Sequence, residues 1–240
     1  MLIAIEGIDG SGKGTQARLL QQRLVAEGRT AALLSFPRYA DTLFGGLIGD
    51  YLNGKLGTLD RVHPLLAALL FAGDRFESRD VLRAACDAHD VVILDRYVAS
   101  NIAHQGARAA GEFVGRIANP SGRLEKPSYE QDELTALIEQ IEYGAFGLPR
   151  ADLTILLDIP AESAAVLIAR KKPRDYTDQA ADLHEADLAY LDSVRQMYRR
   201  LAEGKHDWRI IPVVDSDEVR PIAEIAEDIH AACGSALRRL

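Results

Sequence analysis

The sequence predicts an α/β protein in which a parallel β-sheet is covered by helices on both faces. Short, apolar, branched segments alternate with longer helical patterns along the chain, which is typical of this class. A glycine-rich loop directly follows the first apolar segment, and polar motifs follow the ends of two later ones. Ligands of such sheets bind beyond the carboxyl ends of the strands, so the fold prediction also locates a site.

We expect strands at Leu2–Glu6, Ala31–Phe36, Val91–Asp95, Leu153–Asp158 and Arg209–Val214. Helical patterns cover Gly14–Glu27, Pro64–His89, Gln131–Phe146, Ala161–Lys171, Asp182–Glu203 and Val219–Leu237. Residues 106–130 hold several Gly and Pro with mixed charges and are interpreted as a long loop or insertion. The whole chain, 1–240, is expected to be one domain, in which segment 170–182 is set apart by its basic start.

Composition narrows the class of protein. The chain has 240 residues, 48% of them hydrophobic, which is enough for one core, and its net charge is −8. An acidic chain is a poor candidate for nucleic-acid or anionic-membrane binding. The two cysteines lack metal-type spacing and indicate a reducing compartment. With no signal-peptide pattern and no apolar run of roughly 18 residues, a cytoplasmic location is expected.

The loop Gly-Ile-Asp-Gly-Ser-Gly-Lys-Gly-Thr begins at Gly7, and its Gly7-x-x-x-x-Gly12-Lys13 spacing fits a phosphate-binding P-loop. Glycines let successive backbone N–H groups point at phosphate oxygens, the lysine supplies a cation, and the following helix adds its positive end. The alternative is an ordinary strand-to-helix turn. The predicted ATP-binding residues are Gly7, Asp9, Gly10, Ser11, Gly12, Lys13, Gly14 and Thr15.

Three residues are candidate magnesium ligands. Position 14, usually Ser or Thr in a P-loop, is glycine, so the hydroxyl of Thr15 is the candidate instead. Asp95 ends a buried strand, where a P-loop protein holds magnesium, although an aspartate there can simply cap a turn. Asp9 lies inside the loop, where it would repel a nucleotide unless it contacts magnesium or the sugar of a second substrate. The alternative for Asp9 is a turn-forming role.

Arginines and one aromatic residue are candidates for a second substrate. Arg96 follows Asp95 and either forms an ion pair or neutralises a transferring phosphate, and Arg38 follows the second strand. Phe71 and Arg75 share a helix face and could stack on a base and bind its edge. From spacing alone, a core phenylalanine and a surface pair of Arg75 with Asp74 or Glu77 is the stronger interpretation. The basic residues 170–174 form either a lid over phosphates or a solvated helix end.

With Phe36-Pro37-Arg38-Tyr39, Gly73-Asp74-Arg75 and Asp95-Arg96-Tyr97-x-x-Ser100-Asn101 after the P-loop, the chain resembles the thymidylate kinases over nearly all of its first 215 residues. The resemblance implies a nucleoside-monophosphate kinase fold with a five-stranded parallel sheet and a lid. It implies transfer of the ATP γ-phosphoryl group to dTMP, giving dTDP and ADP for dTTP synthesis. It also implies Mg²⁺ as cofactor and a homodimer.

The resemblance assigns roles by position. It implies that the catalytic residues are Asp9, Lys13, Arg96, Arg170 and Arg174. It implies that the substrate-binding residues are Asp9, Phe36, Arg38, Tyr39, Phe71, Arg75, Arg96, Ser100, Asn101 and His104. The histidine at 104 stands where the family usually has a tyrosine near the acceptor sugar, which leaves the strictness of deoxyribose selection open.

Two other functions remain as alternatives. Lys13-Gly14-Thr15-Gln16 also looks like adenylate kinase, so a kinase of another nucleoside monophosphate is one. A nucleotide-binding switch or regulatory ATPase is the other. The sequence has no Asn-Lys-x-Asp guanine-reading motif, and a switch would not need arginines for a second substrate.

Overall fold

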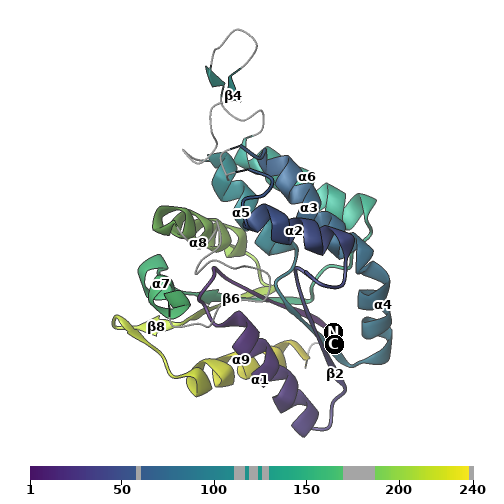
Figure 1. The fold of residues 1–240 in the computed structure, drawn as a ribbon. Helices are drawn as coiled ribbons and strands as arrows, with labels where there is room; N and C mark the ends of the chain where they lie inside the picture. Colours follow the sequence, from purple (N-terminus) through teal and green to yellow (C-terminus); the bar gives the residue numbers. More distant parts are fainter. Residues whose placement is uncertain (58–60, 111–116, 119–123, 126–129, 170–186, 238–240) are drawn as a thin grey trace.

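A five-stranded parallel sheet forms the middle of the molecule in the computed structural model (Figure 1). The structure describes residues 1–57, 61–110, 117–118, 124–125, 130–169 and 187–237. From one edge to the other the strands are β2 (Ala31–Ser35), β3 (Val91–Asp95), β1 (Leu2–Glu6), β6 (Leu153–Asp158) and β7 (Trp208–Pro212). The expected fold class is confirmed, as are the bounds of β1, β3 and β6.

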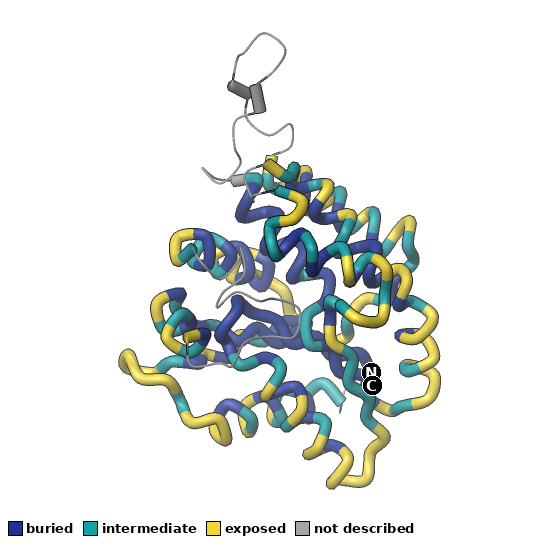
Figure 2. The backbone as a smooth tube through the Cα atoms, in the orientation of Figure 1, coloured by how far each residue is buried: buried dark blue, intermediate teal, exposed yellow. Residues whose placement is uncertain are grey.

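The central strands form because their side chains are apolar on both faces. All five residues of β1 are buried, and β3 and β6 are buried except at their last residue (Figure 2). This is the pattern of a parallel strand that helices cover on both sides. Ile5 of β1 pairs in register with Asp95 of β3, so the loops that follow these two strands leave the sheet side by side.

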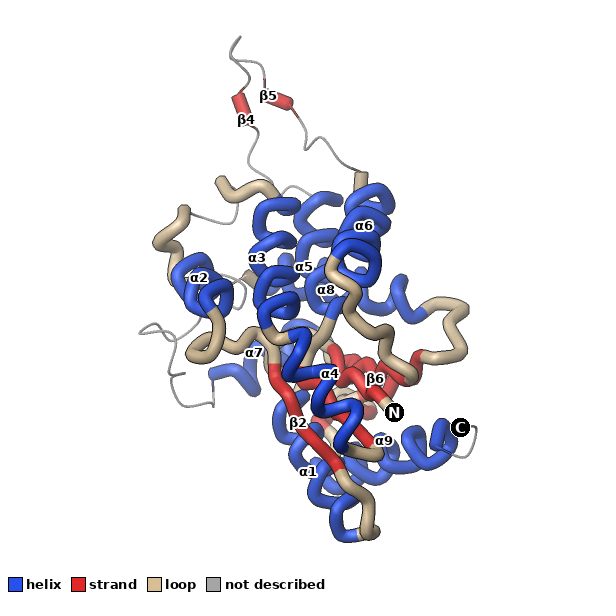
Figure 3. Tube along the Cα trace, turned by 90° about the vertical axis from the view of Figure 1, so that its right-hand side faces the viewer, coloured by secondary structure: helices blue, strands red, loops and turns tan. Residues whose placement is uncertain are grey.

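Helices α1 (Lys13–Ala26) and α9 (Ile222–Leu237) cover one face of the sheet, and most others lie on the opposite side (Figure 1 and Figure 3). That side holds α3 (Pro64–Glu77), α4 (Arg79–Ala88), α5 (Val98–Ala110), α6 (Gln131–Glu139) and α8 (Leu188–Ala202). Helix α2 (Leu43–Leu52) packs on α3, α7 (Ala161–Ala169) packs on α8, and a π-helical turn, η1 (Gln140–Ala145), extends α6. Two short antiparallel ladders pair β4 (Ile117–Ala118) with β5 (Leu124–Glu125), and β8 (Val214–Asp215) with β9 (Glu218–Val219).

Several helix predictions need correction. The pattern over 64–89 forms two helices, which meet at Ser78. Residues 106–110, predicted as part of a loop or insertion, are the last residues of α5. Helix α5 was missed because five of its buried residues are polar, and they hide the apolar stripe that marks a helix. They are Ser100, Asn101, His104, Gln105 and Arg108.

Helix α2 was missed because Gly45, Gly46 and Gly49 give it a low helix propensity. Tertiary contact supplies what propensity does not. Thr42 caps its first turn by accepting a hydrogen bond from the Gly45 N–H, at 2.8 Å. A Cβ atom on Gly73 of α3 would lie 2.6 Å from the Phe44 ring, so a glycine there lets the two helices approach.

The predicted lid, residues 170–182, lies outside the described residues. Its two candidate catalytic side chains, Arg170 and Arg174, lie there too.

Candidate active site

The P-loop leaves β1 and folds around the start of α1. Gly7 and Gly10 both have positive φ, at 141° and 86°. A Cβ atom would lie 2.6 Å from the Leu157 carbonyl oxygen at Gly7 and 2.5 Å from the Ala164 carbonyl oxygen at Gly10. A side chain is therefore excluded at both positions by backbone geometry and by space. Gly12 precedes the first residue of α1, and its carbonyl oxygen accepts hydrogen bonds from the N–H groups of Thr15 and Gln16, both at 3.0 Å.

The ammonium group of Lys13 lies inside the loop. Its side chain is buried, and Nζ donates a hydrogen bond to the Ile8 carbonyl oxygen at 2.8 Å and contacts Ser11 Oγ at 3.5 Å. The cation is thus held close to the loop backbone at the wall of a cavity.

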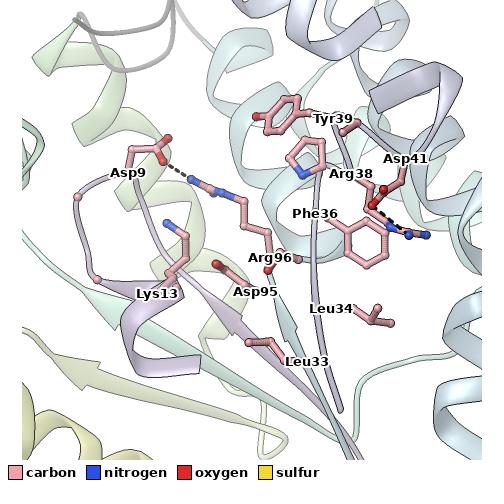
Figure 4. A pocket seen from close by; sticks show the side chains of 16 residues that line it. Asp9, Lys13, Leu33, Leu34, Phe36, Arg38, Tyr39, Asp41, Asp95 and Arg96 are labelled. Carbon is pink, nitrogen blue, oxygen red and sulfur yellow. Dashed lines mark hydrogen bonds and ion pairs between the residues drawn. The ribbon is translucent and has the colours of Figure 1, made fainter. Parts of the chain in front are cut away.

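A cavity of about 950 Å³ opens in front of the loop. Its walls come from the P-loop, the end of β2, the segment 36–41 and the end of β3 (Figure 4). The structure thus brings together the three motifs that follow β1, β2 and β3. Ten of the predicted site residues line the cavity: Asp9, Gly10, Gly12, Lys13, Gly14, Phe36, Arg38, Tyr39, Asp95 and Arg96.

Arg96 reaches across the front of the P-loop. Its Nη2 donates to Asp9 Oδ1 at 2.5 Å (Figure 4). Its Nη1 donates to Ser100 Oγ at 3.1 Å and to the Gly7 carbonyl oxygen at 3.4 Å. Burial lowers the pKa of Arg96, but the surrounding acidic groups, with Asp9 the strongest, together outweigh it, so the net shift is upward. The guanidinium is charged at any physiological pH, and Asp9 and Ser100 fix its direction.

The Asp95 carboxylate lines the same cavity beside Gly14. A Cβ atom on Gly14 would lie 2.8 Å from Asp95 Oδ2, so the carboxylate occupies the space beside residue 14 where a P-loop serine or threonine would carry its side chain. No described residue donates a hydrogen bond to this carboxylate. Thr15, the predicted source of the hydroxyl, is exposed and is not among the described residues that line the cavity.

The segment after β2 is held by a buried carboxylate on α3. Asp74 accepts a hydrogen bond from the Arg38 N–H at 3.1 Å and from Thr42 Oγ1 at 2.5 Å. Burial raises the pKa of Asp74, and these hydrogen bonds oppose the rise. The Arg38 guanidinium pairs with Asp41 at 3.1 Å and points away from Lys13 and Arg96 (Figure 4).

A second group of polar side chains lies in the interior, and we call Arg75, Asn101 and Glu142 the buried polar cluster. Arg75 makes two hydrogen bonds to Glu142, at 2.5 and 2.7 Å, and Asn101 Nδ2 donates to Glu142 Oε1 at 2.8 Å. Burial lowers the pKa of Arg75, but the charge and hydrogen bonds of the Glu142 carboxylate raise it, and the net shift is upward. The expected surface pair of Arg75 with Asp74 or Glu77 is therefore wrong, because a carboxylate on η1 reaches the guanidinium from inside.

One atom of the buried polar cluster has no partner among the described residues. Asn101 Oδ1 is buried and receives no hydrogen bond from any of them. Phe71, also on α3, is half-buried and meets the Tyr51 ring edge-on at 6.4 Å between centroids. A buried acceptor without a donor costs free energy, which a bound ligand that donates a hydrogen bond would recover.

The remaining predicted substrate residues, Ser100 and His104, are buried on α5. Ser100 contacts Arg96 rather than the cavity. His104 Nδ1 lies 3.0 Å from the Tyr190 hydroxyl, and the histidine is not among the described residues that line the cavity. A direct role of these two side chains in substrate binding stays a prediction.

Sequence reasoning missed three acidic residues: Glu6, Asp74 and Glu142. The side chains of all three are fully buried, and each holds a predicted site residue. A signal was available for one of them, because Glu6 ends an otherwise apolar strand next to the P-loop. A carboxylate buried there needs hydrogen-bond donors from elsewhere in the chain.

The described part of the chain lacks a membrane-spanning helix and a cluster of metal-binding side chains. No described helix is both long and apolar enough to cross a bilayer. No group of three or more His, Cys, Asp or Glu side chains with metal-binding geometry occurs among the same residues.

The parallel sheet with its P-loop, and the arginine-bearing wall across the cavity, define a P-loop nucleoside-monophosphate kinase. The chain belongs to the thymidylate kinase family, whose sequence profile matches residues 5–130.

Individual relatives match over nearly the full length. The thymidylate kinase of Mycobacterium tuberculosis (strain ATCC 25618 / H37Rv) is 36% identical over 228 residues, covering 94% of this chain and 97% of that protein. A probable thymidylate kinase of Pyrococcus abyssi is 34% identical and covers 95% and 93%. The solved structure of thymidylate kinase from Candida albicans superposes with a TM-score of 0.71 at 26% identity, over 98% of this chain and 91% of that one.

Proposed function

We propose that this enzyme transfers the γ-phosphoryl group of ATP to dTMP, giving dTDP and ADP for dTTP synthesis. The observation that carries this proposal is the single cavity whose walls hold both the P-loop and Arg96. A donor bound at the loop and an acceptor phosphate bound at the arginine would meet there end to end. The family of the chain supports the choice of thymidylate as acceptor.

The transfer needs positioning and charge neutralisation more than covalent chemistry. An oxygen of the acceptor phosphate attacks the γ-phosphorus in line, the bond from that phosphorus to the β-γ bridging oxygen breaks, and ADP leaves. The acceptor is already an anion, so no strong base is required. The P-loop amides and Lys13 would hold the donor phosphates, and Arg96, with Arg38 after a turn of its side chain, would hold the acceptor phosphate by a two-pronged fork.

Magnesium fits the residues present at this site. The side chains of Asp9 and Asp95 both line the cavity, and the Asp95 carboxylate accepts no hydrogen bond from a described residue. Hard oxygen donors of this kind suit Mg²⁺, which usually binds through one or two carboxylates and the substrate phosphates. We assign Asp95 as the main protein ligand in place of the exposed Thr15. When bound, the ion would neutralise charge on the donor phosphates.

The base of the acceptor would lie against the buried polar cluster. Asn101 Oδ1 is an acceptor without a donor, which suits the N3–H group of thymine. Phe71 offers a ring for stacking, and Arg75, fixed by Glu142, is a donor for a carbonyl oxygen. Replacing Asn101 by Asp should weaken dTMP binding because a second anion would lie beside Glu142. An unchanged KM for dTMP would reject this assignment.

The remaining proposals concern the lid, the oligomeric state and the location of the protein. We assign the lid cations Arg170 and Arg174 to the transferring phosphate, and alanine variants with unchanged turnover would reject that role.

A homodimer is supported by Leu66, Leu69 and Phe76, which leave 58%, 37% and 41% of their surface exposed on α3. A monomeric mass in sedimentation would exclude it. The unbonded Cys86 and Cys233 are in keeping with a cytoplasmic location, which fractionation of the source cells would test.

An ADP-release assay tests the proposed function. The chain is incubated with ATP, Mg²⁺ and one of a panel of nucleoside monophosphates, including dTMP, dUMP, UMP and AMP. We expect the highest kcat/KM with dTMP and only a slow background without acceptor. A response to AMP alone would favour an adenylate kinase, and hydrolysis that no acceptor stimulates would favour a regulatory ATPase.

A further inference from the structure

Glu6, the last residue of β1, joins three elements through one carboxyl group. The side chain is fully buried. Its Oε1 accepts hydrogen bonds from the backbone N–H of Tyr97 at 2.8 Å and of Ser100 at 3.3 Å. Its Oε2 accepts from the hydroxyls of Ser100 at 2.6 Å and of Tyr198, on α8, at 3.0 Å. The first turn of α5 and the middle of α8 are thereby fixed to the strand that precedes the P-loop.

Two of these bonds come from backbone N–H groups at the start of α5: that of Tyr97, and that of Ser100, which is shared with the Tyr97 carbonyl oxygen at 3.2 Å. The first N–H groups of a helix have no partner within the helix, and burial makes an unmet donor costly. Glu6 supplies the acceptor that an N-cap side chain would normally supply, and its negative charge suits the positive end of the helix. The residue just before Tyr97 is Arg96, whose backbone has a φ of 69°. The carboxyl group therefore fixes the chain immediately after an unfavourable turn.

The hydrogen bond between the Ser100 hydroxyl and Glu6 connects Glu6 to the Arg96 side chain. A guanidinium only donates hydrogen bonds, so Ser100 Oγ accepts from Arg96 Nη1 across 3.1 Å. The single hydroxyl hydrogen of Ser100 then points elsewhere, and Glu6 Oε2, at 2.6 Å, is placed to accept it. The hydrogen bonds run in one direction, from Arg96 to Ser100 to Glu6.

We infer that Glu6 is a positioning residue for phosphoryl transfer, because through Ser100 and the Arg96–Tyr97 turn it aims the Arg96 guanidinium into the cavity. The inference rests on the proposed function of Arg96. Glu6 itself does not line that cavity among the described residues, so it acts through Arg96 and not on a substrate. Its effect belongs to the acceptor half of the site, since Lys13 and the loop amides are held by other contacts.

Steady-state kinetics of Glu6→Gln and Ser100→Ala test the inference. The glutamine keeps the shape of Glu6 but places a donor where Ser100 and Tyr198 need an acceptor. We expect kcat/KM for dTMP to fall about tenfold in each variant, while KM for ATP stays within about twofold of the wild type. The double variant should lose no more kcat/KM for dTMP than the less active of the two single variants, because both changes break the same connection. Ser193→Ala, a serine on α8 that bonds only its own helix, is the matched control.

Three outcomes would overturn the inference: unchanged kinetics in the folded variants, losses that multiply in the double variant, or equal weakening of ATP and dTMP. The last result would mean that Glu6 only stabilises the fold. Arg96→Ala separates this inference from the proposed function. If Arg96→Ala keeps its turnover, the proposed role of Arg96 fails. If it loses about 100-fold while Glu6→Gln and Ser100→Ala are normal, the inference about Glu6 fails alone. Should Glu6→Gln not fold, Ser100→Ala and Tyr198→Phe carry the test with the same readouts.

Discussion

The cavity at the P-loop and the buried polar cluster use charge in opposite ways. Lys13, Asp95 and Arg96 line an open cavity of about 950 Å³. Arg75 and Glu142, in contrast, expose 2% and 0% of their side chains and neutralise each other. The first region presents charge to a ligand, and the second keeps it inside.

This difference matches two different ligand parts. A phosphate needs charge and fork-shaped hydrogen bonds, which an open, cation-lined cavity supplies. A neutral base needs a fixed surface with a few directed polar atoms, which a compensated ion pair supplies without a net charge. Under the proposed function, the Arg75–Glu142 pair would supply rigidity, and Arg96 would neutralise phosphate charge. Four predictions test that division, and each changes one of the two regions or a contact between them.

The largest effect is expected on stability, in the buried polar cluster. Glu142→Ala leaves the Arg75 guanidinium buried without its carboxylate and should lower the free energy of unfolding by about 3–5 kcal/mol. Urea denaturation measures it. Asp132→Ala removes the carboxylate of an exposed pair with Arg200 and should cost less than about 1 kcal/mol. Equal losses in the two variants would contradict the structural role of the cluster.

Arg96→Ala and Lys13→Ala should lower turnover by about 100-fold or more, because each removes a cation from the transferring phosphate. Their unfolding free energies should change far less than that of Glu142→Ala. Turnover and the free energy of unfolding in urea are measured on the same preparations and compared. Arg23→Ala, an exposed arginine on α1, is the control. Large destabilisation with normal turnover would reverse the division of roles.

Gly14→Ser sharpens the magnesium assignment. The new Cβ would lie 2.8 Å from Asp95 Oδ2 and should push the carboxylate aside. We expect turnover to fall about tenfold, and Mn²⁺, titrated by electron paramagnetic resonance in the presence of ADP, to bind more weakly. Gly46→Ala, on α2, where a new Cβ would lie in ordinary contact at 4.0 Å from the Tyr39 carbonyl oxygen, is the control. A faster Gly14→Ser enzyme with tighter Mn²⁺ binding would show that the site lacks a hydroxyl ligand.

The smallest effect concerns Asp74, which links α3 to the segment after β2. Burial raises its pKa in the folded chain, so the folded state binds the proton more tightly than the unfolded state. The stability that this group adds is present below its unfolded pKa, near 3.8, and is lost as the pH rises through the raised folded value. The free energy of unfolding of Asp74→Asn should therefore increase relative to that of the wild type as the pH rises through this range. Urea denaturation between pH 4 and 8 measures the difference, and a constant difference would exclude the effect.

Local pattern was enough to predict much of the fold and the three motifs that line the cavity. The bounds of β1, β3 and β6 follow from continuous apolar runs, because a parallel strand covered on both faces needs apolar residues at every position. The P-loop follows from fixed glycine and lysine spacing. The motifs after β2 and β3 could be joined to it because parallel strands end at one edge of a sheet.

The sequence by itself thus determined the sheet, the phosphate loop and the motifs that carry Arg38 and Arg96, since each depends on neighbours in the chain. Only the tertiary structure decided that Arg75 pairs with Glu142, 67 residues away, and that Glu6 accepts from Tyr198, 192 residues away. Such partners have no periodicity, because a buried charge is satisfied by whichever donor or acceptor the packing brings near. The position of the Asp95 carboxylate beside Gly14 has the same origin, in the register of β1 against β3.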